Sequence, residues 1–155
     1  MTFLEEIKEI LEKNQDKRIC VLGTTCTGKS TLLKDIPYAL DMDKIIFPLL
    51  TQEEKDYVCQ TPWTEEIGDC MDKLVKEKIK ISVGSPVFGT VIIDSDLLVY
   101  LDIDDELLKS RTQKRNVDFT NAVNMNKSII EEIKQVNIPC ISVQVREEKN
   151  TDIER

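Results

Sequence analysis

Apolar residues recur at helical spacing at the start of the chain and then gather into short runs. Residues 3–11 place apolar side chains at helical spacing behind a capping box that begins at Thr2, which predicts an amphipathic helix ending near Asn14. Residues 18–22 form a short apolar run that stops at Gly23, which is typical of a strand buried on both faces. The opening of the chain therefore predicts a helix followed by an interior strand.

Helical and strand-like patterns alternate through the rest of the sequence. Further helices are predicted from Lys29 to before Pro37, after Thr51, after Thr61–Pro62, after Asp104 or Asp105, and around residues 129–133. The buried face expected for the helix after Pro62 comprises Trp63, Ile67, Met71 and Leu74. Further strands are predicted at residues 38–40, 79–83, 97–103 and 140–145.

Together these elements predict a single α/β domain over residues 1–155. The domain is expected to comprise an N-terminal helix in residues 1–17, a core in residues 18–145 and a polar surface tail in residues 146–155. Because strands alternate with helices, we expect a five-stranded, mainly parallel sheet with helices on both faces.

The residues after the first strand match the phosphate-binding pattern G-x-x-x-x-G-K-[ST] in full. The two glycines permit a tight turn that directs backbone amides toward a β-phosphate, and the following helix adds its positive end. Lys29 is expected to bridge the β- and γ-phosphates, and the Ser30 hydroxyl is expected to bind Mg²⁺. The predicted nucleotide-binding residues are Gly23, Thr24, Thr25, Cys26, Thr27, Gly28, Lys29, Ser30 and Thr31.

Composition removes several classes of site. The chain has no histidine, which excludes Ser-His and Cys-His nucleophile pairs and the H-E-x-x-H metal site. Its five cysteines include no C-x-x-C pair, so neither a disulfide framework nor a zinc site is expected. Cys26, inside the loop, is either a reactive thiol near a helix start or a small side chain that the loop tolerates.

Charge and hydropathy limit the partners and the location. A net charge of -8 argues against a groove that follows a nucleic-acid backbone. No apolar run approaches the ~18 residues of a membrane span, and Glu5 and Glu6 do not fit the basic start of a secretory signal. We therefore expect a cytoplasmic protein.

Motifs that are missing narrow the class of phosphate-loop protein. A GTPase normally carries Asn-Lys-x-Asp, whereas residues 126–129 read Asn-Lys-Ser-Ile, and no transporter-type Ser-Gly-Gly signature is present. The order of elements from Arg18 to Val145 instead resembles that of the small P-loop kinases, which include adenylate kinase-like nucleoside monophosphate kinases and shikimate kinase. This resemblance implies a three-layer P-loop kinase-like fold that uses Mg²⁺ and ATP.

Two acidic residues follow the predicted second strand. Asp41-Met42-Asp43 is similar to the Asp-x-Asp at the end of that strand in shikimate kinase-like enzymes. Because residues two apart in an extended segment point the same way, both carboxylates are expected to face the cleft. The resemblance implies that one lies near Mg²⁺, through water, and that the other orients an acceptor hydroxyl. A solvent-exposed acidic turn is the alternative.

Two further segments invite comparison with the same family. Val83-Gly84-Ser85 resembles the glycine-containing end of the third strand, which lies against the acceptor in these kinases, although only Gly84 of the usual glycines is present. Asp94 follows an apolar run as a Walker B aspartate does. It directly precedes the fourth strand, however, so a structural role is favoured over metal binding.

A cation cluster occurs in the helix predicted after Asp104. Arg111, Lys114 and Arg115 lie at positions i, i+3 and i+4, so they share one helix face. In the small kinases such residues begin a lid over ATP, which here would be a short segment at residues 116–120. The cluster is suited to stabilising charge on a transferring phosphoryl group, and the alternative is a basic helix end that complements its own dipole.

The leading hypothesis is an ATP-dependent kinase that transfers the γ-phosphoryl group to a small-molecule or nucleotide acceptor. Its expected catalytic residues are Lys29, Asp41, Asp43, Arg111 and Arg115. The main alternative is an ATP-binding regulatory or accessory protein with weak or no kinase activity, and a GTP-binding switch is a third hypothesis. The sequence leaves the acceptor open.

Overall fold

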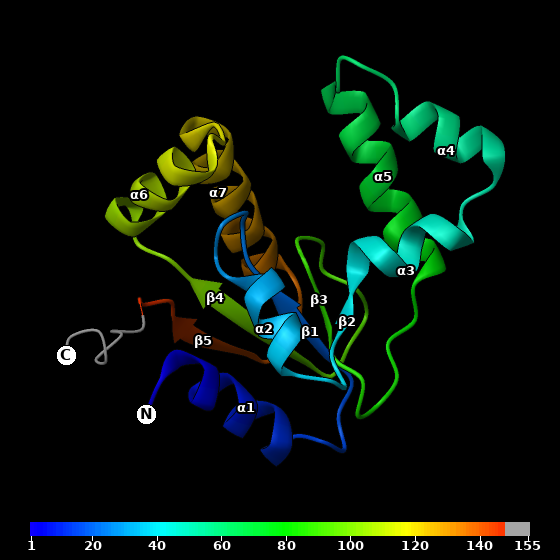
Figure 1. Cartoon of the computed structure of the whole chain (residues 1–155). Helices are drawn as coiled ribbons and strands as arrows, with labels where there is room; N and C mark the ends of the chain where they lie inside the picture. Colours follow the sequence, from blue (N-terminus) through cyan, green and yellow to red (C-terminus); the bar gives the residue numbers. More distant parts are fainter. Residues whose placement is uncertain (148–155) are drawn as a thin grey trace.

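A five-stranded parallel sheet in the order β2-β3-β1-β4-β5 forms the centre of the protein (Figure 1). The computed structural model describes residues 1–147, so residues 148–155 of the predicted surface tail lie outside the described residues. The strands are β1 (Ile19–Leu22), β2 (Leu40–Asp41), β3 (Val87–Gly89), β4 (Leu97–Asp102) and β5 (Cys140–Gln144). The helices are α1 (Phe3–Lys13), α2 (Lys29–Asp35), α3 (Met42–Leu49), α4 (Gln52–Val58), α5 (Glu65–Lys78), α6 (Asp105–Arg115) and α7 (Phe119–Gln135).

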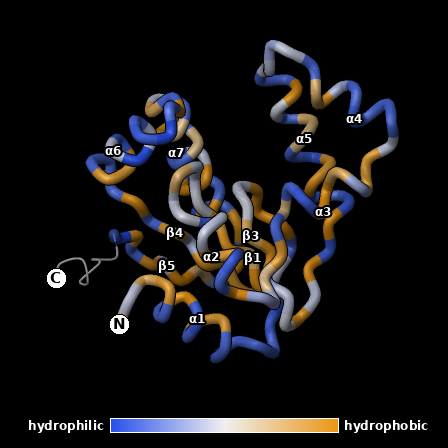
Figure 2. Tube along the Cα trace, viewed as in Figure 1, coloured by the Kyte–Doolittle hydropathy of each residue, from blue (hydrophilic) through white to orange (hydrophobic). Residues whose placement is uncertain are grey.

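Apolar side chains on the two faces of the sheet form two core clusters. In β1, Val21 packs with residues of α1, α2 and α6, whereas Leu22 belongs to the cluster that includes residues of α3, α5 and α7. Successive strand residues point to opposite faces, so a strand buried on both sides supplies both clusters. Figure 2 shows the resulting concentration of hydrophobic residues along the strands. This architecture confirms the predicted α/β class with a parallel sheet and is compatible with a three-layer fold.

The order in which the chain adds strands to the sheet reverses next to β1. From β1 the chain passes through α2 toward β2 at one edge, whereas from β4 it passes through α6 and α7 toward β5 at the other edge. The strands β1 and β4 are neighbours, paired in parallel from Ile19 and Leu97 onward. Open parallel sheets bind ligands outside the carboxyl ends of strands at such a switch point. The predicted phosphate loop follows β1 at this position.

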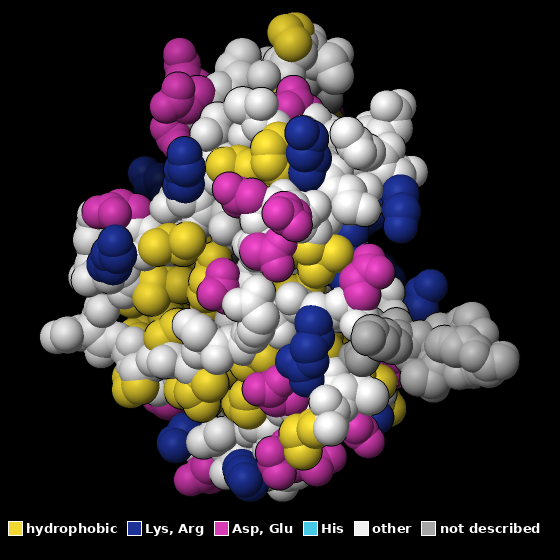
Figure 3. Space-filling view, turned by 90° about the vertical axis from the view of Figure 1, so that its left-hand side faces the viewer, with side chains coloured by type: hydrophobic (Ala, Val, Ile, Leu, Met, Phe, Trp, Pro, Cys, Tyr) yellow, Lys and Arg dark blue, Asp and Glu magenta, His cyan; other side chains and the backbone are white. Residues whose placement is uncertain are grey.

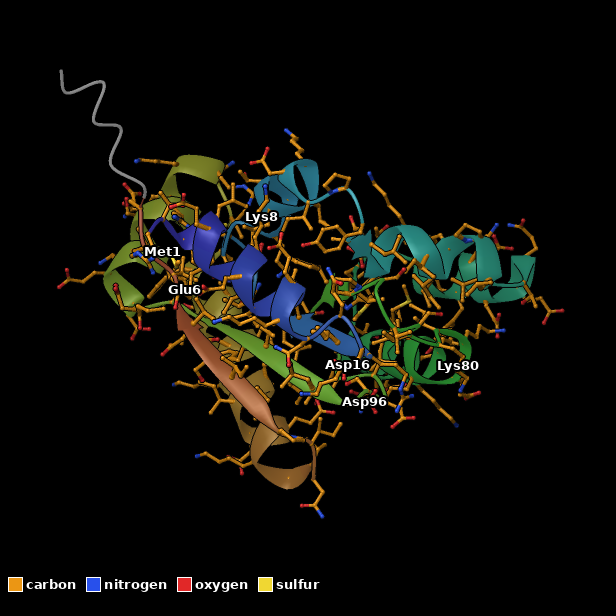
Figure 4. All side chains as sticks on the ribbon, turned by 90° about the horizontal axis from the view of Figure 1, so that it is seen from below. Met1, Glu6, Lys8, Asp16, Lys80 and Asp96 are labelled. Atoms are coloured by element: carbon orange, nitrogen blue, oxygen red, sulfur yellow. The ribbon has the colours of Figure 1, made fainter. Side chains whose placement is uncertain are left out.

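A helix cap and contacts of Arg146 hold the first helix beside the sheet. The Thr2 capping box of α1 is present as predicted. Arg146, just after β5, donates to Glu6 Oε1 at 2.9 Å and to the Met1 carbonyl at 3.0 Å. Figure 4 shows Met1 and Glu6 beside the end of β5. These contacts hold α1 against the last strand.

The predicted third strand at residues 79–83 is wrong. Ile79 is the C-cap of α5, and both Ile79 and Ile81 are buried in the core cluster that also contains Leu74. Their apolar side chains therefore pack the connection after α5 against the core. A turn that contains Gly84 at φ 79° follows this connection. The third strand is instead the three-residue β3, which ends at Gly89.

Gly89 is required by the packing of α3 against the sheet. A Cβ atom at this position would lie 2.4 Å from Met42 Sδ and 2.7 Å from Met42 Cβ. The missing side chain thus lets the start of α3 approach β3 closely.

The segment between β2 and β3 contains a helical arm, formed by α3, α4 and α5 (Figure 1). The capping box at Thr51 is present as predicted, but α3 was not expected. The helix start predicted at Thr61–Pro62 is also wrong, because Thr64 caps α5 by accepting from the Ile67 amide. Trp63 therefore precedes the helix and is 57% exposed, so it is absent from the buried face formed by Ile67 and Leu74.

The strand β5 lies at one edge of the sheet. Only Val143 in β5 is buried, and Cys140 and Ile141 are exposed. Figure 3 shows this side of the molecule, where apolar side chains gather between acidic and basic ones. Within residues 1–147, no helix has both the length and the apolar character that crossing a membrane would require.

Candidate functional site

The loop at residues 23–31 joins the central strand β1 to helix α2. Two of its residues have left-handed backbone conformations, Cys26 at φ 67° and Gly28 at φ 96°. Such turns direct successive amides into one concave surface that suits an anion. At Gly23 a Cβ atom would lie 2.7 Å from Thr27 Oγ1 and 3.1 Å from Leu101 Cβ, so glycine is needed for packing. The geometry of the loop therefore depends on both glycines of the motif.

Threonine hydroxyls hold the loop to its surroundings. Thr24 Oγ1 donates to the Ala122 carbonyl of α7 at 2.7 Å, and Thr27 Oγ1 donates to the Thr24 carbonyl at 2.9 Å. Both threonines are fully buried. Two of the four x positions of the motif, Thr24 and Thr27, are therefore structural here, although the pattern leaves them open.

Lys29 is the central cation of the site. Its ammonium group donates to the carbonyls of Gly23 and Thr24, the latter at 2.9 Å. Burial lowers the pKa of Lys29 to about 8, against the opposing effect of the Asp43 and Asp41 carboxylates. Both hydrogen bonds fix the ammonium group beside the loop.

Two arginines of α6 reach the same loop. Arg111 Nη1 donates to the Cys26 carbonyl at 3.1 Å, and Arg115 Nη1 contacts Cys26 Sγ at 3.6 Å. Arg111, Lys114 and Arg115 line one cavity, which confirms that the three cations share a helix face. The cations therefore gather at the loop, and Cys26 offers its carbonyl and sulfur to them.

Two cavities meet at the loop. The first, of about 550 Å³, is lined by residues 25–31 together with Asp43, Thr90, Arg115 and Met125. The second, of about 440 Å³, combines apolar side chains with the α6 cations and Arg146. Its apolar residues are Phe3, Leu4 and Leu32. The loop borders both cavities, since both are lined by Cys26, Thr27, Gly28, Thr31 and Arg115.

The structure gives the two predicted aspartates different roles at the start of α3. The segment is not extended: Asp41 is the N-cap of α3, and its carboxylate accepts from the Asp43 amide at 3.0 Å. Asp43 lies in the first turn and lines the larger cavity, whereas Asp41 does not line it. Burial, reinforced by Asp41, raises the pKa of Asp43, and Lys29 opposes this effect. The prediction of an extended segment is therefore wrong, because α3 begins at Met42 and the Asp41 carboxylate caps it.

Other predicted positions lie far from the loop. Gly84 lines a separate cavity with Ile19, the first residue of β1, at the end of that strand opposite to the loop. Asp94 pairs with Arg18 at 3.1 Å, and Asp96 also pairs with Arg18 at 3.0 Å. Figure 4 shows Asp96 at that end of the sheet, near Asp16. The ion pair with Arg18 fits the structural role favoured for Asp94. The acceptor-side assignment of Gly84 is wrong, because Gly84 lies at the opposite end of β1 from the loop.

The predicted lid at residues 116–120 is a tight helix connection. Asn116 caps α6 in a left-handed conformation, and Asp118 caps α7 by accepting from the amides of Thr120 and Asn121. The residues between α6 and α7 are therefore used as caps. Arg115, the last residue of α6 before this connection, contacts the phosphate loop at Cys26.

Sequence reasoning missed three features of the site. Thr90 lines the larger cavity directly after β3. It was missed because the third strand was predicted at residues 79–83. Met125 belongs to the first half of α7, which begins at Phe119, well before the residues that predicted the helix. The third feature is the apolar wall that Phe3 and Leu4 give to the smaller cavity. The sequence predicts the helix that contains both residues, but no local pattern shows that this helix lies beside the loop.

Metal ligands are few among the described residues. Within residues 1–147, no group of three or more Cys, Asp, Glu or His side chains could hold a metal ion. The Ser30 hydroxyl is exposed at the start of α2 and lines the larger cavity with Asp43. These oxygens fit a Mg²⁺ ion whose other ligands are phosphates and water. No protein-family model matches the chain, and no match was found among curated proteins.

Proposed function

We propose that the chain binds Mg-ATP at residues 23–31 and transfers the γ-phosphoryl group to a small-molecule or nucleotide acceptor. The proposal includes membership of the small P-loop kinases. One observation carries it: a complete G-x-x-x-x-G-K-S loop follows the central strand at the switch point of the sheet, and two arginines from another helix contact it. Positioning and electrostatic stabilisation account for most of the catalysis of phosphoryl transfer.

The two cavities support a binding mode for ATP. The purine and ribose would occupy the 440 Å³ cavity, where Phe3 and Leu32 supply apolar surface. The triphosphate would cross the loop between Gly28 and Arg115, which line both cavities. The γ-phosphoryl group would then enter the 550 Å³ cavity, which Asp43 also lines.

Each charged residue has a distinct role in this proposal. Lys29 exchanges its bonds to the loop carbonyls for phosphate oxygens, and Arg111 and Arg115 stabilise negative charge that develops during transfer. Asp43 orients the acceptor hydroxyl and takes its proton, for which a raised pKa is favourable. Ser30 would hold Mg²⁺, which supplies additional charge neutralisation at the phosphates. Asp41 contributes by capping α3.

A regulatory or accessory protein is the second candidate, and one observation favours it. Of the two predicted aspartates, only Asp43 lines the cavity, because Asp41 caps α3. A protein that binds ATP without transferring phosphate needs the loop and Lys29 but not a carboxylate near the γ-phosphate. The proposed use of ATP implies a cytoplasmic location, and the five free thiols suit a reducing compartment.

Product formation distinguishes the two candidates. The purified chain is incubated with Mg²⁺ and γ-labelled ATP together with a panel of nucleosides, nucleoside monophosphates and small hydroxy compounds, and labelled product is separated from labelled phosphate. Labelled product from at least one acceptor is expected. ATP binding in a thermal-shift titration without any labelled product would favour the regulatory candidate, and a shift with GTP alone would contradict the choice of ATP.

A further inference from the structure

The cavity that would receive the acceptor contains few charged residues. Beyond the loop, it is lined by Asp43 from α3, Thr90 after β3, Arg115 from α6 and Met125 from α7. Asp43 is therefore the one charged residue that the helical arm contributes to this cavity within residues 1–147. Met125 is 39% exposed, so the wall formed by α7 is partly apolar.

The arm as a whole is acidic. Residues 42–78 contain nine aspartates and glutamates and five lysines, and the chain has no arginine between Arg18 and Arg111. Arginine is the side chain best suited to bidentate recognition of a phosphate or carboxylate. The helical arm therefore offers no guanidinium group to an anionic acceptor.

None of the five lysines in residues 42–78 lines this cavity. Lys76 pairs with Glu132 at 2.6 Å, and Lys78 pairs with Glu54 at 3.4 Å. Lys29 and Arg115, the cations that line the cavity, contact the phosphate loop itself. Both would be used by the triphosphate of ATP, so a second anion in the cavity would meet Asp43 without a cation of its own.

We propose that the acceptor is a neutral or positively charged hydroxyl compound and that anionic acceptors, such as nucleotides and hydroxy acids, are disfavoured. This inference rests on the proposed kinase function. An ammonium group on the acceptor would be attracted to Asp43, and an apolar portion would contact Met125. Specificity of this kind arises as much from repulsion of the wrong charge as from attraction of the right one.

The transfer step has a simple balance. The acceptor hydroxyl oxygen forms a bond to the γ-phosphorus while the bond from that phosphorus to the β-γ bridging oxygen breaks. Asp43 takes the hydroxyl proton and later releases it to solvent, and ADP carries away the bridging oxygen. A neutral alcohol therefore yields a phosphate monoester, ADP and one proton.

Acceptors matched in shape but different in charge test the inference. Glucose, glucosamine and glucuronate share a ring, and thymidine and thymidine monophosphate share a nucleoside. Phosphorylated product from Mg-ATP is measured for each compound, and binding of each is measured calorimetrically with a non-hydrolysable ATP analogue and Mg²⁺. We expect the neutral or cationic member of a set to exceed the anionic member by about tenfold or more in kcat/KM.

A charge added to the cavity wall provides the second test. Met125→Lys should increase the relative kcat/KM for the anionic member of a set, whereas Met125→Gln, a control of similar length without charge, should not. An equal effect of both variants would show that the wall does not select by charge and would overturn the inference.

The outcomes separate this inference from the proposed function. Faster phosphorylation of glucuronate or thymidine monophosphate than of their uncharged partners would overturn the inference and uphold the kinase. Calorimetric binding of the ATP analogue with no product from any acceptor would contradict the kinase, and the inference with it.

Discussion

The phosphate loop and the helical arm differ in how many contacts hold their residues in place. The loop is held by buried hydroxyls, by Arg111 on the Cys26 carbonyl and by Lys29 on two further carbonyls. The arm instead leaves large apolar side chains exposed, among them Phe47 at 39% and Trp63 at 57%. Figure 1 shows α4 and α5 projecting from the sheet, apart from α6 and α7.

This difference shows which half of the proposed site is already formed before a ligand binds. In the loop, Lys29 and Arg111 already contact the backbone that would hold the phosphates. In the arm, one carboxylate faces the cavity and the remaining contacts depend on the acceptor. We therefore expect substitutions in the loop to affect every substrate, and substitutions in the arm to affect turnover of particular acceptors.

The largest effect is expected for Lys29→Ala, which removes the central cation of the loop. We expect kcat/KM to fall on the order of 1,000-fold, as for other preorganised electrostatic contacts, while the circular dichroism spectrum stays unchanged. Lys34→Ala, an exposed lysine in the same helix, is the matched control and should retain activity. Near-normal turnover of the Lys29→Ala variant would show that the loop is not the phosphate site.

The two aspartates should respond differently. Asp43→Asn should lower kcat by about 100-fold with little change in ATP affinity, because it removes the base and keeps the shape. Asp41→Ala should instead lower the free energy of unfolding by about 1 kcal/mol through loss of the α3 cap. Urea denaturation and steady-state kinetics measure both quantities. A larger loss of kcat in the Asp41 variant than in the Asp43 variant would reverse the assignment.

The arginine that reaches the loop from α6 should act on the transition state. Arg111→Ala removes a charged hydrogen bond, so we expect kcat to fall on the order of 30-fold. ATP affinity, measured by calorimetry, should fall less. Lys109→Ala tests an exposed residue of the same helix and should be nearly neutral. Equal losses in kcat and affinity would make Arg111 a ground-state contact.

The smallest effect concerns pH. Burial lowers the pKa of Lys29 to about 8, and phosphate binding requires the protonated form. ATP affinity should therefore be highest well below pH 8 and be about tenfold weaker by pH 9. Without ATP, the same residue adds to the free energy of unfolding as pH rises from about 8 to 10.5, because the unfolded chain keeps its proton longer. The stability trend should be absent in Lys29→Met, and an unchanged trend in this variant would assign it to another group.

The same contrast explains what the sequence predicts well. The loop, its flanking strand and α2 follow local rules, since glycine positions, an apolar run and Pro37 each act within a few residues. The α6 cations were also predictable, because helical spacing alone puts them on one face. The parallel sheet follows from the alternation of elements.

The arm did not follow from local patterns. Ile79 and Ile81 have a strand-like pattern but pack as a connection in the core, which depends on tertiary contacts. Asp41 was assigned to catalysis, yet its carboxylate caps a helix that no signal had indicated. The true third strand is only Val87–Gly89, too short for its alternation to be distinctive.

Isothermal titration of the purified full chain with ATP at fixed Mg²⁺ tests the central claim most directly. The account predicts saturable binding at one site per chain, together with its loss in the Lys29→Ala variant and its retention in Lys34→Ala. Absence of measurable binding of both ATP and GTP to the folded wild-type chain would contradict it.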